Sequence, residues 1–399
     1  MAPEPVTHPL SLSPFLQEWL PAFCLPRRPD RSEYPLSQPA SEAKPAQREE
    51  TNMLFGLFGS AQADSATLGA GVGQGFLDYI DFNVDAERLG YYSTFLVEHH
   101  FTGWGQVSAT LNMLTWLAAR TKTLRVGTAT MVLPWHNPVL LAEQAATLDM
   151  LSGGRLDLGV GKGYRHSEFA GFGIPASEAE ARFEECLDIM LKAWSSKERF
   201  SHHGQFWSLE NIVVEPTPKT RPAMWMGAGS EPSIRKVASR GFNLLLDQFA
   251  DANLTGQRIA MFKQALAEQN RKFNPAEVAV ARDLFIAKDA SEKEAAIERL
   301  NKSRQRTIDV ARAPNQTSGS HILSYAKGGN MPPTDSSLIG TIDEIREKLA
   351  ALQDAGVGYV ILSILGGSRH TLHRFATEIM PEFGADPIKE LSPAELSAV

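Results

Sequence analysis

The feature that most restricts the fold of this chain is an alternation of short apolar runs with amphipathic segments, which begins near Met53. The apolar residues in these runs are mostly consecutive rather than at every second position, as is typical of parallel strands that are covered on both faces. Eight runs have this character, and they span residues 54–58, 93–97, 124–132, 156–160, 223–226, 243–246, 278–286 and 359–363. Eight strand–helix units in about 350 residues predict an α/β fold that closes into a (β/α)8 TIM barrel, with insertions between some units.

The segments between these runs carry the marks of helices. Apolar residues recur at spacings of three and four positions from Phe183 to Trp194, which places them on one face of a helix. Before the last expected strand, Thr341 and Glu344 form a capping-box pattern, and Gly356 follows at the expected end of that helix. These helices are what a parallel barrel needs, because each crossover between parallel strands is usually a helix.

The sequence predicts three parts of unequal size. Residues 1–52 hold ten of the 24 prolines and show neither strand nor helix period, which predicts a disordered N-terminal extension. We expect the barrel over residues 53–385 and a C-terminal tail over residues 386–399. Inside the barrel, residues 200–218 have room for extra strands. The stretch 311–337 is rich in glycine and proline, and we interpret it as a lid over the strand ends.

Charge and composition argue against several classes of partner. The formal net charge is −7 with no long cluster of Lys and Arg, which disfavours nucleic acid and anionic membranes. The longest apolar runs, such as residues 359–365, are far shorter than the ~20 residues of a membrane span. The two cysteines, Cys24 and Cys186, make no disulfide framework. We therefore expect a cytoplasmic protein that acts on a small-molecule substrate.

In barrels of this kind the chemistry lies at the carboxyl ends of the strands. After the fifth expected strand, Gly227 and Gly229 allow a tight turn, and Ser230 is a good N-cap for the next helix. Pro232 suits the first turn of that helix, so free backbone N–H groups would face the barrel mouth. Ser230 and Ser233 could then hold a phosphate, although an ordinary capped helix has the same local sequence.

Two other strand ends carry polar groups. The glycine-rich segment 159–163 lacks the signs of a dinucleotide or P-loop site, because no helix starts at once and Lys162 is followed by glycine. Lys162 therefore either contributes charge to a phosphate or is a solvated loop lysine. His99 and His100 end the second strand, where adjacent side chains point to opposite sides, so we expect no metal site there. A single histidine that faces the cavity suits acid–base chemistry.

Several motifs, taken in order along the chain, resemble the bacterial luciferase family of flavin-dependent monooxygenases. They lie at residues 98–102 (Glu-His-His-Phe-Thr), 126–129, 132–134, 137–139, 152–155 and 340–341, and the resemblance covers residues 53–383. It implies reduced flavin mononucleotide (FMN) as the cofactor and O2 as a co-substrate, which oxygenate a small organic molecule through a C4a-(hydro)peroxyflavin. We also expect a separate NAD(P)H-dependent flavin reductase, since the chain shows no nicotinamide-binding fingerprint.

The resemblance also assigns roles to residues. His99 would be the catalytic residue that faces the flavin, with the neighbouring His100 turned away. The ring would lie across the barrel mouth above a 129–130 peptide that is cis in the family. The residues expected to bind the cofactor are Phe58, Ala129, Thr130, Lys162, Gly163, Tyr164, Gly229, Ser230, Ser233, Asp247 and Gln248, and those expected in the substrate pocket are Trp104 and Trp135.

Two departures from the family pattern bear on the type of activity that we expect. Gly161 stands where the luciferase has a cysteine at the flavin site, and Gly229 stands where it has a phosphate-binding glutamate. We therefore expect a general monooxygenase of the family and not a light-emitting luciferase. The alternatives are a deazaflavin-dependent oxidoreductase, a flavin-binding protein without activity and an inactive partner subunit. The substrate stays unassigned, and a homodimer is an open expectation.

Overall fold

The structure of the chain, a computed structural model, describes residues 52–63, 73–103, 105–311 and 334–384. Four expectations of the sequence fall wholly or largely on other residues. These concern the N-terminal extension, the pocket residue Trp104, most of the expected lid and the C-terminal tail, and they lie outside the described residues.

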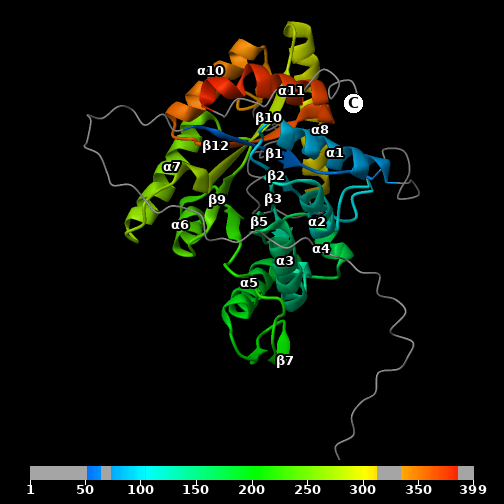
Figure 1. The fold of residues 1–399 in the computed structure, drawn as a ribbon, viewed down its shortest axis with the longest axis vertical. Helices are drawn as coiled ribbons and strands as arrows, with labels where there is room; N and C mark the ends of the chain where they lie inside the picture. Colours follow the sequence, from blue (N-terminus) through cyan, green and yellow to red (C-terminus); the bar gives the residue numbers. More distant parts are fainter. Residues whose placement is uncertain (1–51, 64–72, 104, 312–333, 385–399) are drawn as a thin grey trace, which may run out of the picture. The chain divides into compact units, whose positions relative to one another are not determined.

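Eight parallel strands form a closed ring (Figure 1). Along the chain they are β1 (Leu54–Gly59), β2 (Ser93–Leu96), β3 (Arg125–Thr128), β5 (Leu156–Gly161), β8 (Ala223–Gly227), β9 (Asn243–Leu246), β10 (Val278–Ile286) and β12 (Tyr359–Ile364). Each strand pairs with the next in this order, and β12 pairs with β1. The predicted (β/α)8 barrel is therefore confirmed.

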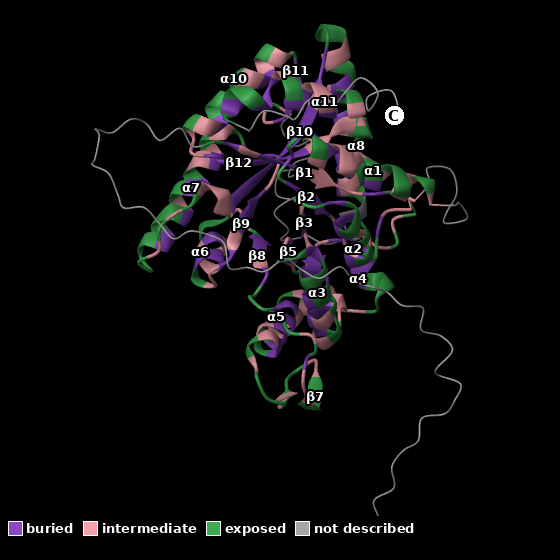
Figure 2. Ribbon diagram, viewed as in Figure 1, coloured by how far each residue is buried: buried purple, intermediate pink, exposed green. Residues whose placement is uncertain are grey.

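Helices surround the ring of strands, as Figure 1 shows. They are α1 (Gln74–Arg88), α2 (Thr110–Arg120), α3 (Pro138–Ser152), α4 (His166–Gly171), α5 (Ala179–Ser195), α6 (Glu231–Ser239), α7 (Ala252–Ala267), α8 (Ala290–Ala311), α10 (Ile342–Asp354) and α11 (Arg369–Glu378). Short 3-10 turns lie at Leu133–Trp135, Ala176–Glu178, Pro275–Glu277, Leu365–Gly367 and Met380–Phe383. The strands are buried, while the helices alternate between buried and exposed faces (Figure 2).

Local sequence signals set the ends of several helices. The Asn137 side chain accepts hydrogen bonds from the N–H groups of Val139 and Leu140, and so caps α3. The reciprocal capping box of Thr341 and Glu344 at the start of α10 is present as predicted. Each of these contacts satisfies N–H groups that a helix start leaves unpaired.

The prediction of one continuous strand over residues 124–132 is wrong. β3 ends at Thr128, and a separate short strand, β4 (Met131–Val132), pairs with β5. The cis peptide between Ala129 and Thr130 lies between them. Side-chain hydrogen bonds flank this break. The Thr128 hydroxyl before it donates to the Gly159 carbonyl, and the Val132 N–H after it donates to the Glu98 carboxylate.

Three further strands lie outside the ring. β6 (Phe200–His203) and β7 (Ser208–Ile212) form an antiparallel hairpin in the insertion where extra strands were expected. β11 (Leu338–Gly340) pairs with β10 and was not predicted. Three residues are too few to show a strand pattern in a sequence.

The inside of the barrel is a packed core. Its buried apolar side chains include Phe95, Trp225 and Tyr359, whose rings meet edge to face or tilted with centroids 5.5–6.5 Å apart. Phe58 and Ala129, partly buried, pack against this cluster. Because the interior is filled, the barrel mouth above Phe58 and Ala129 is the place for a ligand.

Candidate active site

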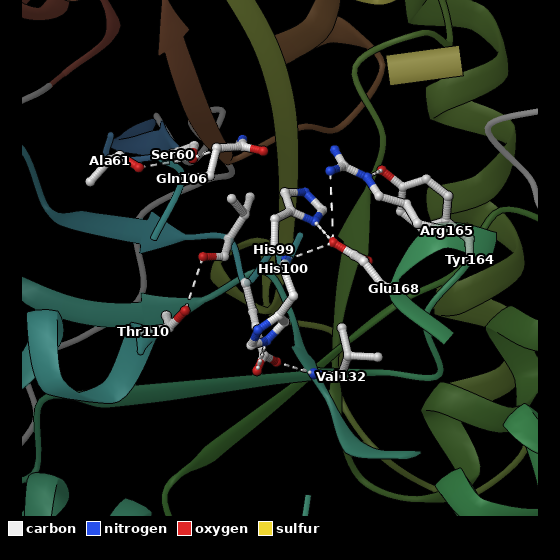
Figure 3. A network of polar contacts seen from close by, with 12 residues as sticks. Ser60, Ala61, His99, His100, Gln106, Thr110, Val132, Tyr164, Arg165 and Glu168 are labelled. Atoms are coloured by element: carbon white, nitrogen blue, oxygen red, sulfur yellow. Dashed lines mark hydrogen bonds and ion pairs between the residues drawn. The ribbon is translucent and has the colours of Figure 1, made fainter. Parts of the chain in front are cut away.

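Two buried carboxylates organise the carboxyl ends of β2 and β5. The Glu98 cluster consists of Glu98, the rings of His100 and His136, and the Val132 N–H group. The Glu168 cluster consists of Glu168, the His99 ring, the Arg165 guanidinium and the His100 N–H group. Figure 3 shows His99 and Arg165 converging on Glu168, while Val132 lies at the other cluster. As predicted, the side chains of His99 and His100 turn to different partners.

Every contact of the Glu98 carboxylate stabilises its charge. One oxygen lies 3.0 Å from His100 Nε2 and 2.7 Å from His136 Nε2, and the other accepts the Val132 N–H at 2.7 Å. Burial raises the pKa of this carboxyl, but the hydrogen bonds from His100, His136 and Val132 outweigh it and lower the pKa to about 2. Glu98 is therefore ionised throughout the neutral range, and it ties the end of β2 to the segment after the cis peptide.

The Glu168 carboxylate serves a different set of donors. Glu168 lies in α4, just after β5, and is 2% exposed. Its Oε1 atom is 3.0 Å from His99 Nδ1 and accepts the His100 N–H at 2.9 Å. The Arg165 Nη1 atom is 3.7 Å from the same oxygen, which is an ion pair beyond hydrogen-bond distance.

These contacts define the state of His99. A carboxylate accepts hydrogen bonds and donates none, so the His99 Nδ1 atom carries the proton and Nε2 is left as an acceptor. Burial lowers the pKa of His99, Glu168 raises it and the nearby Arg165 lowers it, with a net decrease. The ring is therefore neutral at neutral pH. No residue in the described part of the chain hydrogen-bonds to Nε2, which suits this atom to accept a proton from a ligand.

Aromatic rings cover the outer side of the two clusters. The Trp135 ring stacks on Phe172 at 5.2 Å between centroids and meets Phe169 edge to face at 5.0 Å. The His100 ring packs edge to face against both Trp135 and Phe172. Trp135, which was predicted to line the substrate pocket, packs within this aromatic group, and its buried Nε1 has no hydrogen-bond partner among the described residues.

The first turn of α6 forms a hydroxyl-rich corner. Ser230 stands at the N-cap position, but its side chain does not cap the helix. Instead, its hydroxyl lies 2.9 Å from the Ser233 hydroxyl. A helix start leaves N–H groups unpaired and carries a partial positive charge, so this corner suits an anion.

Lys162 is linked to the same helix through a shared carboxylate. The Lys162 Nζ atom lies 2.7 Å from one Glu180 oxygen, and Lys236 of α6 lies 3.0 Å from the other. The hydrogen bond from Lys162 is the main cause that lowers the pKa of Glu180, and Lys236 adds to it. The Lys162 side chain is 56% exposed, so it can exchange Glu180 for an incoming phosphate at little cost.

Asp247 and Gln248 lie at the end of β9, next to the hydroxyl-rich corner. The Asp247 carboxylate accepts the N–H groups of Phe249 and Ala250 and pairs with Arg258 at 3.0 Å. Arg258 also donates to the Gly229 carbonyl at 3.0 Å, so one buried guanidinium joins the loops after β8 and β9. The Gln248 carbonyl accepts a hydrogen bond from Ser336.

The described residues fit a planar ring with a phosphate tail. A Cβ atom added to Gly161 would lie 2.4 Å from the Thr130 hydroxyl, and one on Gly163 would lie 2.7 Å from a Val132 methyl, so glycine lets the β5 loop press against residues 130–132. A Cβ atom on Gly227 would meet nothing within 4 Å, which indicates open space at the end of β8. The apolar floor and the hydroxyl-rich corner thus lie at the same end of the barrel.

Other features of the described residues do not compete with this site. They contain no group of three His, Cys, Asp or Glu side chains that could hold a metal ion. Among the helices in the ranges that the structure describes, none has the length and hydropathy to cross a membrane. A hollow of about 290 Å³ opens at the amino ends of β1 and β2, at the opposite end of the strands. One oxygen of the Glu87 carboxylate at its edge, Oε1, accepts four hydrogen bonds from residues 122–124.

Comparison with known proteins decides the family. A sequence profile of the luciferase-like monooxygenases matches residues 53–358. The chain belongs to this family. The oxygenase component of a flavin-dependent trigonelline monooxygenase from Acinetobacter baylyi is 23% identical over 333 residues, which are 79% of this chain and 91% of that protein. An F420-dependent glucose-6-phosphate dehydrogenase from Kineococcus radiotolerans is 32% identical over 167 residues, 40% of this chain and 49% of that protein.

A solved structure shows the same fold. The crystal structure of the monooxygenase RslO1 from Streptomyces bottropensis superimposes with a TM-score of 0.70 at 22% identity, over 83% of this chain and 100% of that one. The family resemblance seen in the motifs and the expected barrel are both confirmed. The match therefore places the chain among the luciferase-like monooxygenases, a family of oxidoreductases.

Several residues that shape the site were missed by the sequence analysis. Arg165, Glu168, His136 and Arg258 carried no motif, although Arg165 and Glu168 stand three positions apart beside a strand end. In the sequence, the signal available for Glu168 was an acid directly before the apolar Phe169, shortly after a strand end. Its partner His99 is 69 positions away in the sequence, which no local pattern can show.

Proposed function

We propose that this chain is an oxygenase that uses reduced FMN and O2 to oxygenate a small organic substrate. The observation that carries this proposal is the arrangement at His99. A neutral imidazole, oriented by a buried carboxylate, presents Nε2 at the mouth of a luciferase-like barrel. A proton acceptor held in this way suits a reaction that must move a proton to or from a bound cofactor or substrate.

The cofactor would be held at two ends. Its phosphate would contact Ser230, Ser233 and Lys162, with the backbone of Gly163, Tyr164 and Gly229 close by. Its ring would lie on Phe58 and on Ala129–Thr130, with Asp247 and Gln248 beside it. When bound, the reduced flavin supplies the electrons and the reactive site for oxygen.

The chain's own residues would transfer a proton, exclude water and hold the segment under the ring. His99 Nε2 accepts and returns a proton, and Glu168 keeps the ring in the tautomer that allows it. The aromatic wall around Trp135, with Trp104 expected in the same pocket, excludes water from the reacting atoms. Glu98 holds the segment under the ring through Val132.

Reduced flavin would come from a separate NAD(P)H-dependent reductase. The relative from Acinetobacter baylyi is named as the oxygenase component of its enzyme, which supports this division of labour. A deazaflavin-dependent oxidoreductase is the second candidate, because an F420-dependent dehydrogenase is among the similar proteins. The cytoplasmic location and the homodimer stay predictions.

Anaerobic titration of reduced FMN into the full chain tests the proposal. Exchanging both Ser230 and Lys162 for alanine should weaken binding by about 2–4 kcal/mol, since each removes a charge-assisted hydrogen bond to the phosphate. The matched control removes Ser239 and Lys197, which are an exposed serine and an exposed lysine away from the corner. Binding and oxidation of reduced F420 in place of FMN, without oxygen consumption, would favour the second candidate.

A further inference from the structure

Arg165 is a buried cation whose hydrogen-bonding capacity is mostly unused. The residue is 3% exposed, and its Nη1 atom is buried without a hydrogen-bond partner. A guanidinium has five N–H donors. Among the described residues, only the Tyr164 hydroxyl accepts from one of them, at 3.4 Å from Nε. A buried charge in this state is costly unless a ligand completes its shell.

The nearest anion, Glu168, forms no hydrogen bond with Arg165 in this structure. Glu168 Oε1 already accepts hydrogen bonds from the His99 ring and the His100 N–H group. Arg165 Nη1 stays 3.7 Å from that oxygen, so Glu168 balances the charge of Arg165 without a hydrogen bond. The contrast with Arg155 is large, because Arg155 directs five hydrogen bonds to backbone carbonyls and a hydroxyl.

The unused donors lie beside the proposed reaction centre. Arg165 and His99 approach the same Glu168 oxygen, and Figure 3 shows both side chains directed to it. Arg165 precedes α4 at the end of β5, and α4 is in contact with α8, which follows β10. Helices that follow strands at different places in the ring are thus in contact next to Arg165.

We propose that Arg165 binds a planar oxyanion of the substrate, a carboxylate, and holds the substrate beside His99 Nε2. A guanidinium offers two parallel N–H groups that match the two oxygens of a carboxylate. The carboxylate would accept hydrogen bonds from the two Nη groups, on the side opposite Glu168, where repulsion between the two anions is least. The inference rests on the proposed function and adds a substrate class to it.

Binding of simple carboxylates to the full chain tests this inference without turnover. We would titrate acetate, benzoate and 3-phenylpropanoate into the apo and the FMN-loaded protein by calorimetry, with the corresponding amides as neutral probes. At least one carboxylate should bind the wild type and bind Arg165→Gln about ten- to a hundredfold more weakly, the loss expected for a charge-assisted pair. The amides should bind both proteins alike.

Two further variants complete the design. Arg165→Lys keeps the charge but loses the paired N–H geometry, so it should fall between the wild type and Arg165→Gln, and it covers the case in which the glutamine variant does not fold. Arg306→Gln removes an equal charge from an exposed position of α8 and should leave carboxylate binding unchanged.

The outcomes separate this inference from the proposed function. Failure of the wild type to bind reduced FMN would overturn the proposed function, and the apo titration would still test Arg165. The inference is overturned if no carboxylate binds the wild type, or if Arg165→Gln binds carboxylates as the wild type does. It is also overturned if Arg165→Gln loses affinity for FMN by the same factor, since Arg165 would then serve the cofactor.

Discussion

The Glu98 cluster and the Glu168 cluster each place a buried carboxylate among histidine and backbone donors at the carboxyl end of the barrel. In the Glu98 cluster both oxygens are used, and every donor around the carboxylate belongs to the protein. In the Glu168 cluster two groups stay unfinished, namely His99 Nε2 and the Arg165 guanidinium.

The difference separates structure from chemistry within a few residues. A network in which every polar group is hydrogen-bonded makes the fold rigid. A buried polar group without a hydrogen bond raises the free energy of the folded protein, and a ligand that supplies the missing bond removes this penalty. We therefore assign stability to the Glu98 cluster and binding and proton transfer to the Glu168 cluster. His99 belongs to the Glu168 cluster and His100 to the Glu98 cluster, so the same substitution at these two neighbouring positions tests the assignment directly.

The largest effect is expected for His99. His99→Ala should fold and bind FMN but lose about 10²–10⁴ in turnover, the usual contribution of a positioned acid–base group. His100→Ala should lose much less turnover and more stability, because the ring packs against Trp135 and Phe172 and pairs with Glu98. Steady-state turnover of a substrate found by screening with reduced FMN, together with urea unfolding, measures both. A greater loss of turnover in His100→Ala would reverse the assignment of the two clusters.

The next effect is on stability and belongs to Glu98. Because its folded pKa is about 2, below the ordinary 4.5, Glu98 stabilises the protein above pH 4.5, and the stabilisation is lost as the pH falls toward 2. Glu98→Gln should lower the free energy of unfolding by about 3 kcal/mol at pH 7. The difference in the free energy of unfolding between the wild type and Glu98→Gln should decrease as the pH falls from 4.5 to 2.

Urea unfolding at a series of pH values measures that gap. Glu210→Gln, which changes a 71% exposed carboxylate, is the matched control and should show no gap at any pH. If Glu98→Gln is as stable as the wild type at pH 7, the Glu98 cluster does not have the structural role that we assign to it.

The smallest effect is a shift in the acid limb of the pH–rate profile. Neutral His99 is the active form, so turnover should fall as the pH drops through the His99 pKa, which burial and Arg165 keep below 6.5. Glu168→Gln removes a negative charge and should move the limb to lower pH. Arg165→Gln removes a positive charge and should move it to higher pH. Each shift should be about half to one pH unit.

The pH dependence of kcat with saturating substrate records these shifts. A structural role for Glu168 alone would lower turnover at every pH without moving the limb. Shifts of Glu168→Gln and Arg165→Gln in the same direction would show that the charges around His99 do not set its protonation.

Much of the fold was predictable because it follows from local patterns. The eight strands appear as apolar runs, and the Thr341–Glu344 capping box is a contact between neighbours in the chain. The break between β3 and β4 was not predictable from periodicity, because the residues at it, Thr128 to Thr130, are small or β-branched and are compatible with a continuous strand. It exists where the Val132 N–H finds a partner in Glu98, which is 34 positions earlier in the sequence.

For the site, the sequence alone determined which strand ends carry histidine, serine and lysine, and its motifs identified the family to which the chain belongs. Only the tertiary structure decided that His99 and Arg165 share Glu168, that His100 and His136 share Glu98, and that Lys162 shares Glu180 with α6. The physical reason is that side-chain spacing within a strand or helix follows from its own period, whereas these partners come together when the barrel closes. Closure also removes water from Glu168 and Arg165, and burial is what leaves the Arg165 guanidinium in need of a ligand.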